Sequence, residues 1–230
     1  MNKILENKKV IFLDVGYTLD APASGDWMIT NRFNEVAGDR IKGKDHSEIE
    51  RAIYAANDYL AKNHLLTTTK EEYKQYIEFY SIVSEKLDLR LSEKELEDIA
   101  YDRTYNMKNY IVYPDTAQTV KKLSESFKIG IISDTFPSID SQLEYIGVSE
   151  YISFSTYSCT LGVLKPDKRM YLDALGKCGV PAEETVFVDD RTENLEGAAK
   201  LGITPVLITV NPVSDSETSI TKIRKLSDLL

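Results

Sequence analysis

Hydrophobic residues along this chain follow two different spacings, and the change between them divides the sequence into regions. The four apolar residues 10–13 are typical of a buried strand. From about residue 27 to 109, apolar residues recur at helical spacing, as at Ile49, Ile53, Ala56 and Leu60. This spacing predicts four helices, at roughly 26–37, 45–63, 70–87 and 93–108, the last opened by a capping box at Ser92 and Glu95.

From about Val112 the pattern changes to short apolar runs that alternate with helices. It predicts strands at roughly 127–133, 151–155, 185–190 and 205–210, and helices at 137–146, 166–178 and 192–201. Three glycines stand where those helices should end: Gly147, Gly179 and Gly202. The polar segment 211–219 is expected to be a loop before a terminal helical turn.

Strands separated by helices of this length indicate βαβ crossovers and a parallel sheet. The strand at 10–13 belongs with this second half, so the helical region is an insertion that follows it. The predicted fold is therefore α/β, a doubly wound parallel sheet of the Rossmann type. Its core comprises 1–19 and 112–230, and a helical cap is inserted at 20–111.

Composition restricts the partners and the compartment. The chain has 230 residues and a formal net charge of −9, which argues against a sequence-independent nucleic-acid binder. Two cysteines suit a reducing compartment, and no stretch approaches the ~18 apolar residues that span a membrane. We expect a cytoplasmic protein with a small-molecule partner and no membrane contact. His46 and His64 fall in the cap and are expected at its surface.

Reactive side chains follow the ends of several predicted strands. Asp14 follows 10–13, Ser133 ends 127–133, and Asp189 and Asp190 end 185–190, while Lys165 follows 151–155 by way of a loop. In an open parallel sheet, ligands bind beyond the carboxyl ends of the strands. We therefore expect two or three carboxylates, one hydroxyl and one lysine to meet in a single crevice.

This set suits group transfer to a carboxylate, assisted by a hard cation. Mg²⁺ prefers one or two carboxylates together with waters and phosphate oxygens. Asp14 and Asp190 could hold it, with a backbone carbonyl near Gly16 as a further ligand. Asp14 could then attack a phosphorus atom and form an aspartyl-phosphate. Lys165 would offset the negative charge, and Ser133 would hold the phosphoryl oxygens.

Four segments in this order resemble the four motifs of the haloacid dehalogenase (HAD) superfamily: "DVGYTL" (14–19), "IISD" (131–134), "KPDKRMY" (165–171) and "VDDRTENLEGA" (188–198). The helical insertion is similar to the C1 cap of that family, which closes over the active site. The resemblance implies a hydrolase whose catalytic residues are Asp14, Thr18, Ser133 and Lys165. It implies substrate contacts from Ser133, Asp134, Lys165 and Asn194, and a Mg²⁺ site at Asp14, Gly16 and Asp190 with Asp189 beside it.

One position departs from the phosphatase pattern. Gly16 stands where HAD phosphatases usually carry a second Asp that protonates the leaving group and then activates water. Such acid–base help is typically worth ~10²–10⁴-fold in rate. Dehalogenase and phosphonatase relatives also lack this acid. The leading hypothesis is Mg²⁺-dependent hydrolysis of a small phosphorylated metabolite through Asp14.

Two alternatives stay open. One is a metal-independent 2-haloacid dehalogenase, against which Asp190 and the lack of an identifiable arginine and aromatic halide cradle in the cap both count. The other is a binding or regulatory module with weak turnover, which Gly16 motivates. Single residues also have structural interpretations: Asp190 could cap the next helix, and Tyr171 is expected to pack in the core.

Overall fold

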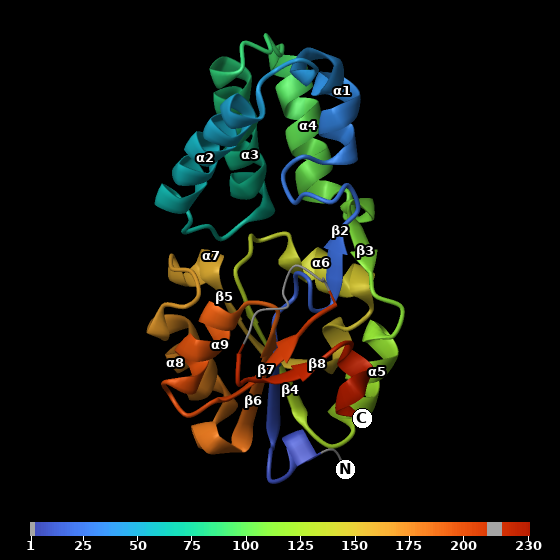
Figure 1. Ribbon diagram of the computed structural model, residues 1–230, viewed down its shortest axis with the longest axis vertical. Helices are drawn as coiled ribbons and strands as arrows, with labels where there is room; N and C mark the ends of the chain where they lie inside the picture. The colour runs from blue at the N-terminus through green and yellow to red at the C-terminus, as the bar shows by residue number, and fades with distance from the viewer. Residues whose placement is uncertain (1–2, 211–217) are drawn as a thin grey trace. The chain divides into compact units, whose positions relative to one another are not determined.

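A computed structural model describes residues 3–210 and 218–230 of the chain. The chain forms two compact units (Figure 1). The core unit comprises Met1–Ala21, Ile111–Thr135 and Ile139–Leu230, and the helical unit comprises Pro22–Tyr110 and Phe136–Ser138. The sequence pattern gave an insertion at 20–111 and no indication that Phe136–Ser138 belong with it.

The core unit is built on a six-stranded sheet with the order β5-β4-β1-β6-β7-β8. Each neighbouring pair of strands is parallel. This arrangement confirms the predicted α/β class. The strands are β1 (Val10–Leu13), β4 (Lys128–Ser133), β5 (Ile152–Tyr157), β6 (Thr185–Asp189), β7 (Thr204–Ile208) and β8 (Thr221–Ile223).

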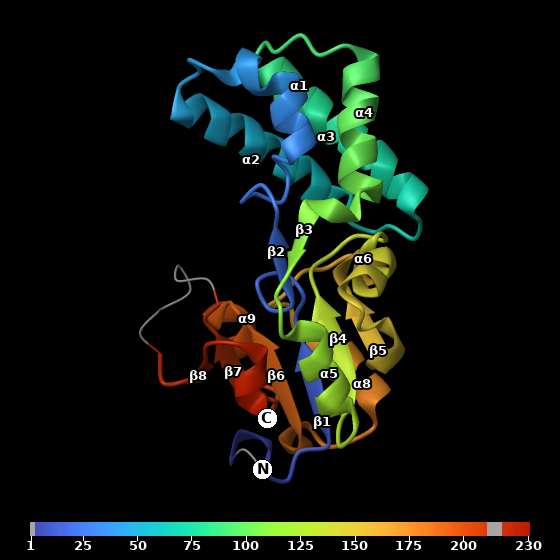
Figure 2. The same cartoon turned by 90° about the vertical axis from the view of Figure 1, so that its right-hand side faces the viewer.

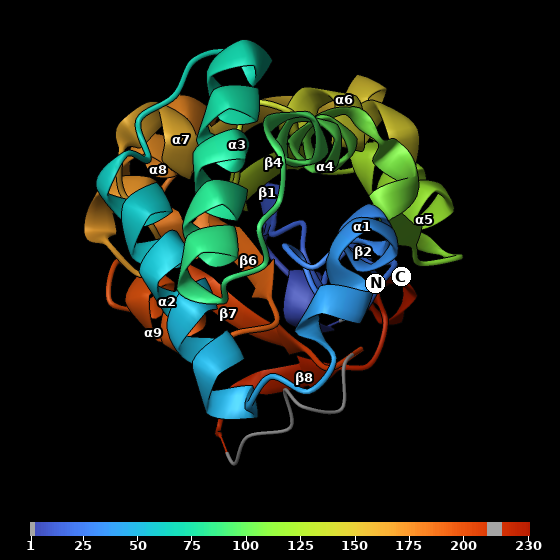
Figure 3. The ribbon, with the colours of Figure 1, turned by 90° about the horizontal axis from the view of Figure 1, so that it is seen from above.

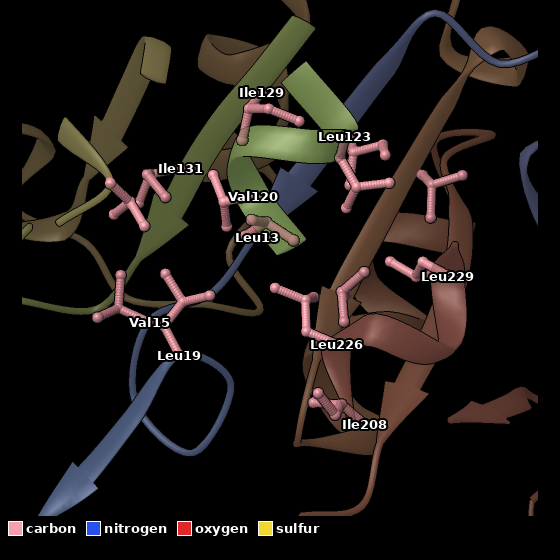
Figure 4. Close-up of a cluster of buried hydrophobic side chains, with 14 of the residues drawn as sticks. Leu13, Val15, Leu19, Val120, Leu123, Ile129, Ile131, Ile208, Leu226 and Leu229 are labelled. Carbon is pink, nitrogen blue, oxygen red and sulfur yellow. The ribbon is translucent and has the colours of Figure 1, made fainter. Parts of the chain in front are cut away.

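Helices cover both faces of this sheet because β1, at its centre, is apolar on both sides. Ile11 and Leu13 pack with α5 (Thr116–Ser124), α6 (Ile139–Ile146) and the C-terminal 3₁₀ turn Leu226–Leu229. Val10 and Phe12 pack with α8 (Lys168–Cys178) and α9 (Thr192–Ala199) on the other face. Figure 2 shows α5 against the sheet, and Figure 4 shows Leu13 within the first cluster.

Gly130 lies in β4 where the sheet leaves no room for a side chain. A Cβ atom there would come within 2.2 Å of the Phe154 ring and 2.9 Å of the Phe12 ring. Those two rings meet edge to face, with 5.8 Å between their centres. The absence of a side chain at Gly130 therefore leaves room for this aromatic pair to cover β4, the strand that ends at Ser133.

The helical unit contains four helices: α1 (Asn31–Ile41), α2 (His46–Lys62), α3 (Thr69–Lys86) and α4 (Glu93–Tyr105). α3 packs against both α2 and α4, as Figure 3 shows for α2 and α3. Its buried face repeats at helical spacing and includes Glu72, Tyr76, Tyr80 and Val83. Capping boxes begin α3 at Thr68 and α4, as predicted, at Ser92.

The chain joins the two units through a two-stranded sheet of β2 (Asp20–Pro22) and β3 (Tyr110–Val112). Ala23 N–H donates to the Asn109 carbonyl at 2.9 Å, so the two ends of the insertion lie side by side. Neither strand was predicted, because three residues carry too little pattern to be recognised.

Several boundaries differ from the prediction for local reasons. The first cap helix begins at Asn31 rather than near 26, because Thr30 caps it through its side chain. The helix expected from 166 begins at Lys168, with Asp167 as its N-cap. The predicted pattern omitted α5, the short helix α7 (Ser158–Leu161) and β8. The glycines at the expected helix ends all have positive φ, from 69° to 88°.

Further predictions have mixed outcomes. The loop expected at 211–219 falls largely on 211–217, outside the described residues, and the terminal turn follows at Leu226–Leu229. His46 is exposed as expected, but the prediction for His64 is wrong, since it is buried edge-on against Phe136. Over residues 3–210 and 218–230, none of the helices is long and apolar enough to cross a membrane.

Candidate active site

Asp14 is the first residue after β1, and the sheet fixes its backbone. Its N–H donates to the Val188 carbonyl of β6 at 2.9 Å. The chain then turns back through Tyr17, whose φ of 54° is left-handed, and Leu19 N–H closes the turn on the Val15 carbonyl at 2.7 Å. Asp14 is therefore held rigidly at the carboxyl edge of the sheet, and its side chain is 11% exposed.

Lys165 is buried and occupies the centre of the site. Its ammonium lies 2.7 Å from Asp14 Oδ1 and 2.7 Å from Asp189 Oδ2, and it donates to the Ile132 carbonyl at 3.2 Å. The three donors of the ammonium thus have three acceptors. The Phe187 ring lies below it, 5.3 Å from Nζ. Burial lowers the pKa of Lys165, but the neighbouring Asp14 and Asp189 together raise it above its ordinary value, which favours the charged ammonium.

Three carboxylates surround this one cation. Ligand atoms of Asp14, Asp189 and Asp190 all lie within 4.8 Å of one another, as in a metal-binding group. Burial, together with Asp189, raises the pKa of Asp14, and Lys165 only partly offsets this. Burial and Asp189 likewise raise the pKa of Asp190 to about 6. A divalent cation bound here would neutralise the group, so the residues fit Mg²⁺ chemistry.

The two adjacent acids differ in how many protein donors they already have. Asp189 is fully buried and accepts from Lys165, from Arg191 N–H at 2.8 Å and from Asn194 Nδ2 at 3.0 Å. Asp190 is half-buried and forms no ion pair within the described residues. Asp190 is therefore the more available ligand, while Asp189 holds Lys165. Neither caps the next helix, since α9 follows Arg191 without a side-chain cap.

The remaining residues from the sequence prediction surround this group in different ways. Ser133 ends β4 and is 3% exposed. Asp134 is exposed, and its Oδ1 accepts from Lys165 N–H at 2.8 Å. Thr18 is fully buried, and its hydroxyl has no hydrogen-bond partner among the described residues. Asn194 is 2% exposed and uses its amide on Asp189, so a substrate contact from it stays a prediction.

Tyr171 packs in the core as expected. It is fully buried, and its hydroxyl donates to the Asn194 carbonyl at 2.8 Å. A Cβ on Gly197 would lie 2.8 Å from Pro166 Cβ and 3.0 Å from Tyr171 Oη. The absence of a side chain at Gly197 lets α9 approach the segment that carries Lys165. The sequence alone did not indicate that this position must be a glycine.

Sequence reasoning missed an arginine in the helical unit. Arg103 is buried in α4, its guanidinium carbon lies 4.9 Å from the centre of the Tyr76 ring, and Nη1 donates to Tyr110 Oη at 2.9 Å. It stands between Asp102 and Thr104 in "YDRTY", so its burial has no local signal. No arginine and aromatic halide cradle could be identified in the cap from the sequence, and the contact of Arg103 with Tyr76 and Tyr110 is an arginine–aromatic group that the sequence did not reveal.

A protein-family model described as haloacid dehalogenase-like hydrolase matches residues 27–202. The match begins after Asp14, so the assignment of Asp14 depends on the geometry above. The chain is 30% identical over 139 residues to an (S)-2-haloacid dehalogenase of Burkholderia cepacia, 58% of this chain and 60% of that protein. It is 30% identical over 108 residues to a glyceraldehyde 3-phosphate phosphatase of Methanopyrus kandleri, 46% of each.

Solved structures with both activities share the fold. A HAD phosphatase from Thermococcus onnurineus superposes with a TM-score of 0.66 at 22% identity, covering 96% of this chain and 95% of that one. A 2-haloacid dehalogenase from Pseudomonas syringae gives 0.64 at 17% identity, covering 96% of each. Matches to both curated relatives span 60% of their length or less, so similarity alone does not choose between the two reactions.

Proposed function

The chain belongs to the haloacid dehalogenase-like hydrolases, and we propose that it hydrolyses a small phosphorylated metabolite with Mg²⁺, using Asp14 as the nucleophile. The observation that carries this proposal is the group of three carboxylates around one lysine. A dehalogenation through Asp14 needs no metal, whereas an excess of buried carboxylates over cations favours a divalent ion. A cytoplasmic location is part of the same proposal.

Each residue then has a defined task. The free oxygen of Asp14 attacks phosphorus while Lys165 holds the other oxygen at 2.7 Å, so the carboxylate presents one lone pair in a fixed direction. The bond from phosphorus to the leaving oxygen breaks, and an aspartyl-phosphate forms. Ser133 and backbone N–H groups at the end of β4 hold the phosphoryl oxygens. Mg²⁺, held by Asp14 and Asp190, would neutralise the phosphoryl charge.

The departing oxygen and the attacking water need proton transfer that Gly16 cannot supply. Asp20, the nearest other acid in the sequence, is fully buried, and its Oδ2 accepts from Gln142 at 2.7 Å. We therefore expect a solvent water to protonate the leaving group. This favours substrates with a good leaving group, such as acyl or aryl phosphates, over alkyl phosphates.

A second candidate, metal-independent hydrolysis of a 2-haloacid, is favoured by the similarity to the (S)-2-haloacid dehalogenase, at 30% identity over 139 residues. Gly16 is also compatible with it, since displacement of a halide needs no proton donor for the leaving group. In that reaction Asp14 would attack carbon and release halide, and water would then cleave the aspartyl ester.

A substrate panel distinguishes the candidates. Phosphate monoesters and 2-haloacids are assayed with Mg²⁺ and with a chelator, for the wild type and for Asp14→Asn. We expect phosphate release that the chelator abolishes and that Asp14→Asn lacks while its circular dichroism spectrum is unchanged. Halide release in the chelator would replace this proposal with the second candidate. No turnover of either class would favour the weakly active binding module.

A further inference from the structure

Glu72 lies in the first turn of α3 and is completely buried. Its Oε2 accepts the N–H of Ser138 at 2.7 Å, and its Oε1 accepts the Ser138 hydroxyl at 2.7 Å. Both carboxylate oxygens are thus committed to one residue. Charge-assisted hydrogen bonds of this kind are shorter and stronger than neutral ones, so the contact is firm and directional.

α3 also contacts Phe136, which lies two residues before Ser138 in the chain. The Phe136 ring lies 5.3 Å from the Tyr76 ring and 5.3 Å from the His64 ring. Glu72 and Tyr76 are one helical turn apart and therefore face the same side of α3. α3 therefore contacts Phe136–Ser138 at both ends: the Glu72 carboxylate binds Ser138, and the Tyr76 ring packs against Phe136.

The positive charge of Arg103 offsets part of the free-energy cost of burying the Glu72 carboxylate. Burial raises the pKa of Glu72, while the Ser138 hydroxyl and then the positive Arg103 lower it. The Arg103 guanidinium is fixed by its position over the Tyr76 ring and by its bond to Tyr110. These contacts lie within the helical unit, yet residues 136–138 come from the connection between β4 and α6.

This connection begins at Ser133. The core unit fixes the next two residues, because Lys165 N–H donates to Asp134 Oδ1 at 2.8 Å and Thr135 N–H donates to Ser158 Oγ at 2.8 Å. The chain then enters the helical unit at Phe136 and returns at Ile139. The segment that follows Ser133 is thus bound by the core unit at residues 134 and 135 and by α3 of the helical unit at Ser138.

We propose that Glu72 is a positioning residue for Ser133. By holding Ser138, it fixes the path of 134–138 and so the angle at which the Ser133 hydroxyl leaves β4. The inference rests on the proposed function, in which Ser133 holds phosphoryl oxygens. A displacement of ~1 Å in a binding group can cost ~10²-fold in rate, so loss of this contact should reach the chemistry.

Kinetics of three variants test the proposal. Glu72→Gln keeps the shape but replaces one acceptor oxygen with a donor, and Ser138→Ala removes the hydroxyl. Glu78→Gln makes the same change at an exposed site on the same helix and is the matched control. We expect kcat/KM to fall at least tenfold in the first two and to stay unchanged in the control, measured well below the melting temperature of each variant. Ser138→Thr, which keeps the hydroxyl, should restore activity.

A lower melting temperature with unchanged kcat/KM in Glu72→Gln would mean that the contact only stabilises the helical unit, and would overturn the proposal. So would equal losses in Ser138→Ala and Ser138→Thr.

Hydrogen exchange tests the coupling without any substrate. Amides of 133–135 should exchange faster in Glu72→Gln than in Glu78→Gln. Faster exchange confined to 136–138, or no change, would contradict the inference. If the wild type turns over no substrate, the proposed function fails and this measurement alone decides whether Glu72 acts on the Ser133 strand end.

Discussion

Lys165 Nζ lies 2.7 Å from Oδ1 of Asp14, and both side chains are buried beneath the carboxyl edge of the sheet. The pair does two things. It compensates part of the charge on three crowded carboxylates, and it aims the second oxygen of Asp14.

Replacing Lys165 by Met should destabilise the core unit by about 3–5 kcal/mol near pH 8, since it leaves buried carboxylates without their cation. Lys165 lowers the pKa of Asp14, so without it the folded-state pKa of Asp14 rises further above the unfolded value. A carboxyl whose pKa is higher in the folded state than in the unfolded state lowers the free energy of unfolding at pH values above its unfolded-state pKa. This loss becomes smaller as the pH falls and the carboxyl of the folded protein is protonated. The deficit should therefore shrink between pH 8 and pH 5.

Urea unfolding followed by circular dichroism at both pH values measures this deficit. Lys168→Met, which alters an exposed lysine three residues away, is the matched control and should leave stability unchanged. A Lys165→Met deficit that is equal at pH 5 and pH 8 would contradict the charge-balance account.

Mg²⁺ should stabilise the folded protein. A ligand at 100 times its Kd stabilises by about 2.7 kcal/mol, which corresponds to a rise in Tm of roughly 5–10 °C for a chain of this size. Asp190→Asn should remove most of the rise, because Asp190 is the carboxylate without an ion-pair partner in the described residues. Differential scanning fluorimetry with and without Mg²⁺ measures the shift. Asp39→Asn, at an exposed acid, should keep it. An undiminished shift in Asp190→Asn would place the cation elsewhere.

Gly16→Asp should accelerate hydrolysis of alkyl phosphates by roughly 10²–10⁴-fold, the usual range for general acid–base catalysis. Gly16 is not among the residues with positive φ, so an aspartate is compatible with the backbone. Gly16→Asn has nearly the same shape without an ionisable proton and should give no acceleration. Steady-state rates on an alkyl and an aryl phosphate test this. Equal rates in both variants and the wild type would mean that proton transfer is already supplied from another group.

His64 should make the helical unit sensitive to mild acid. Burial lowers the pKa of His64 below 6.5, so the unfolded chain takes up this proton more readily than the folded one. Its contribution to stability is complete above pH 6.5 and is lost as the pH falls through the folded-state value. His64→Gln should therefore flatten the dependence of stability on pH between 7 and 5.

Trp27, the one tryptophan of the chain, lies in the helical unit against Tyr110, and its fluorescence can follow unfolding there. His46→Gln changes the other, exposed histidine and is the control. If both variants unfold with the pH dependence of the wild type, His64 is not the acid-sensitive group.

The order of strands and helices could be predicted because each element has its own signal. The β1 run and the strand-end residues Ser133 and Asp189 locate the sheet edge without knowledge of contacts, since parallel strands share a carboxyl end. The three carboxylates and Lys165 follow from the same rule, and the structure brings them together.

What could not be predicted depends on tertiary contacts. Glu71 and Glu72 are adjacent acids in the sequence, yet one is an exposed partner in a capping box and the other is completely buried. Arg103 and His64 are likewise buried only because rings from distant segments cover them. Propensity and periodicity describe one element at a time, so they carry no information about which polar side chain another element will enclose.

The side-by-side pairing of β2 and β3 means that the helical region enters and leaves the core at one point. Insertions, deletions or replacement of the residues between these strands need not change the order or pairing of the strands in the core sheet. Mutation can therefore vary the helical region while the group of carboxylates around Lys165 is kept. One constraint accompanies this freedom. Any replacement must also accommodate Phe136 and Ser138, which makes that short segment the place where changes in the two halves of the molecule should be correlated among descendants.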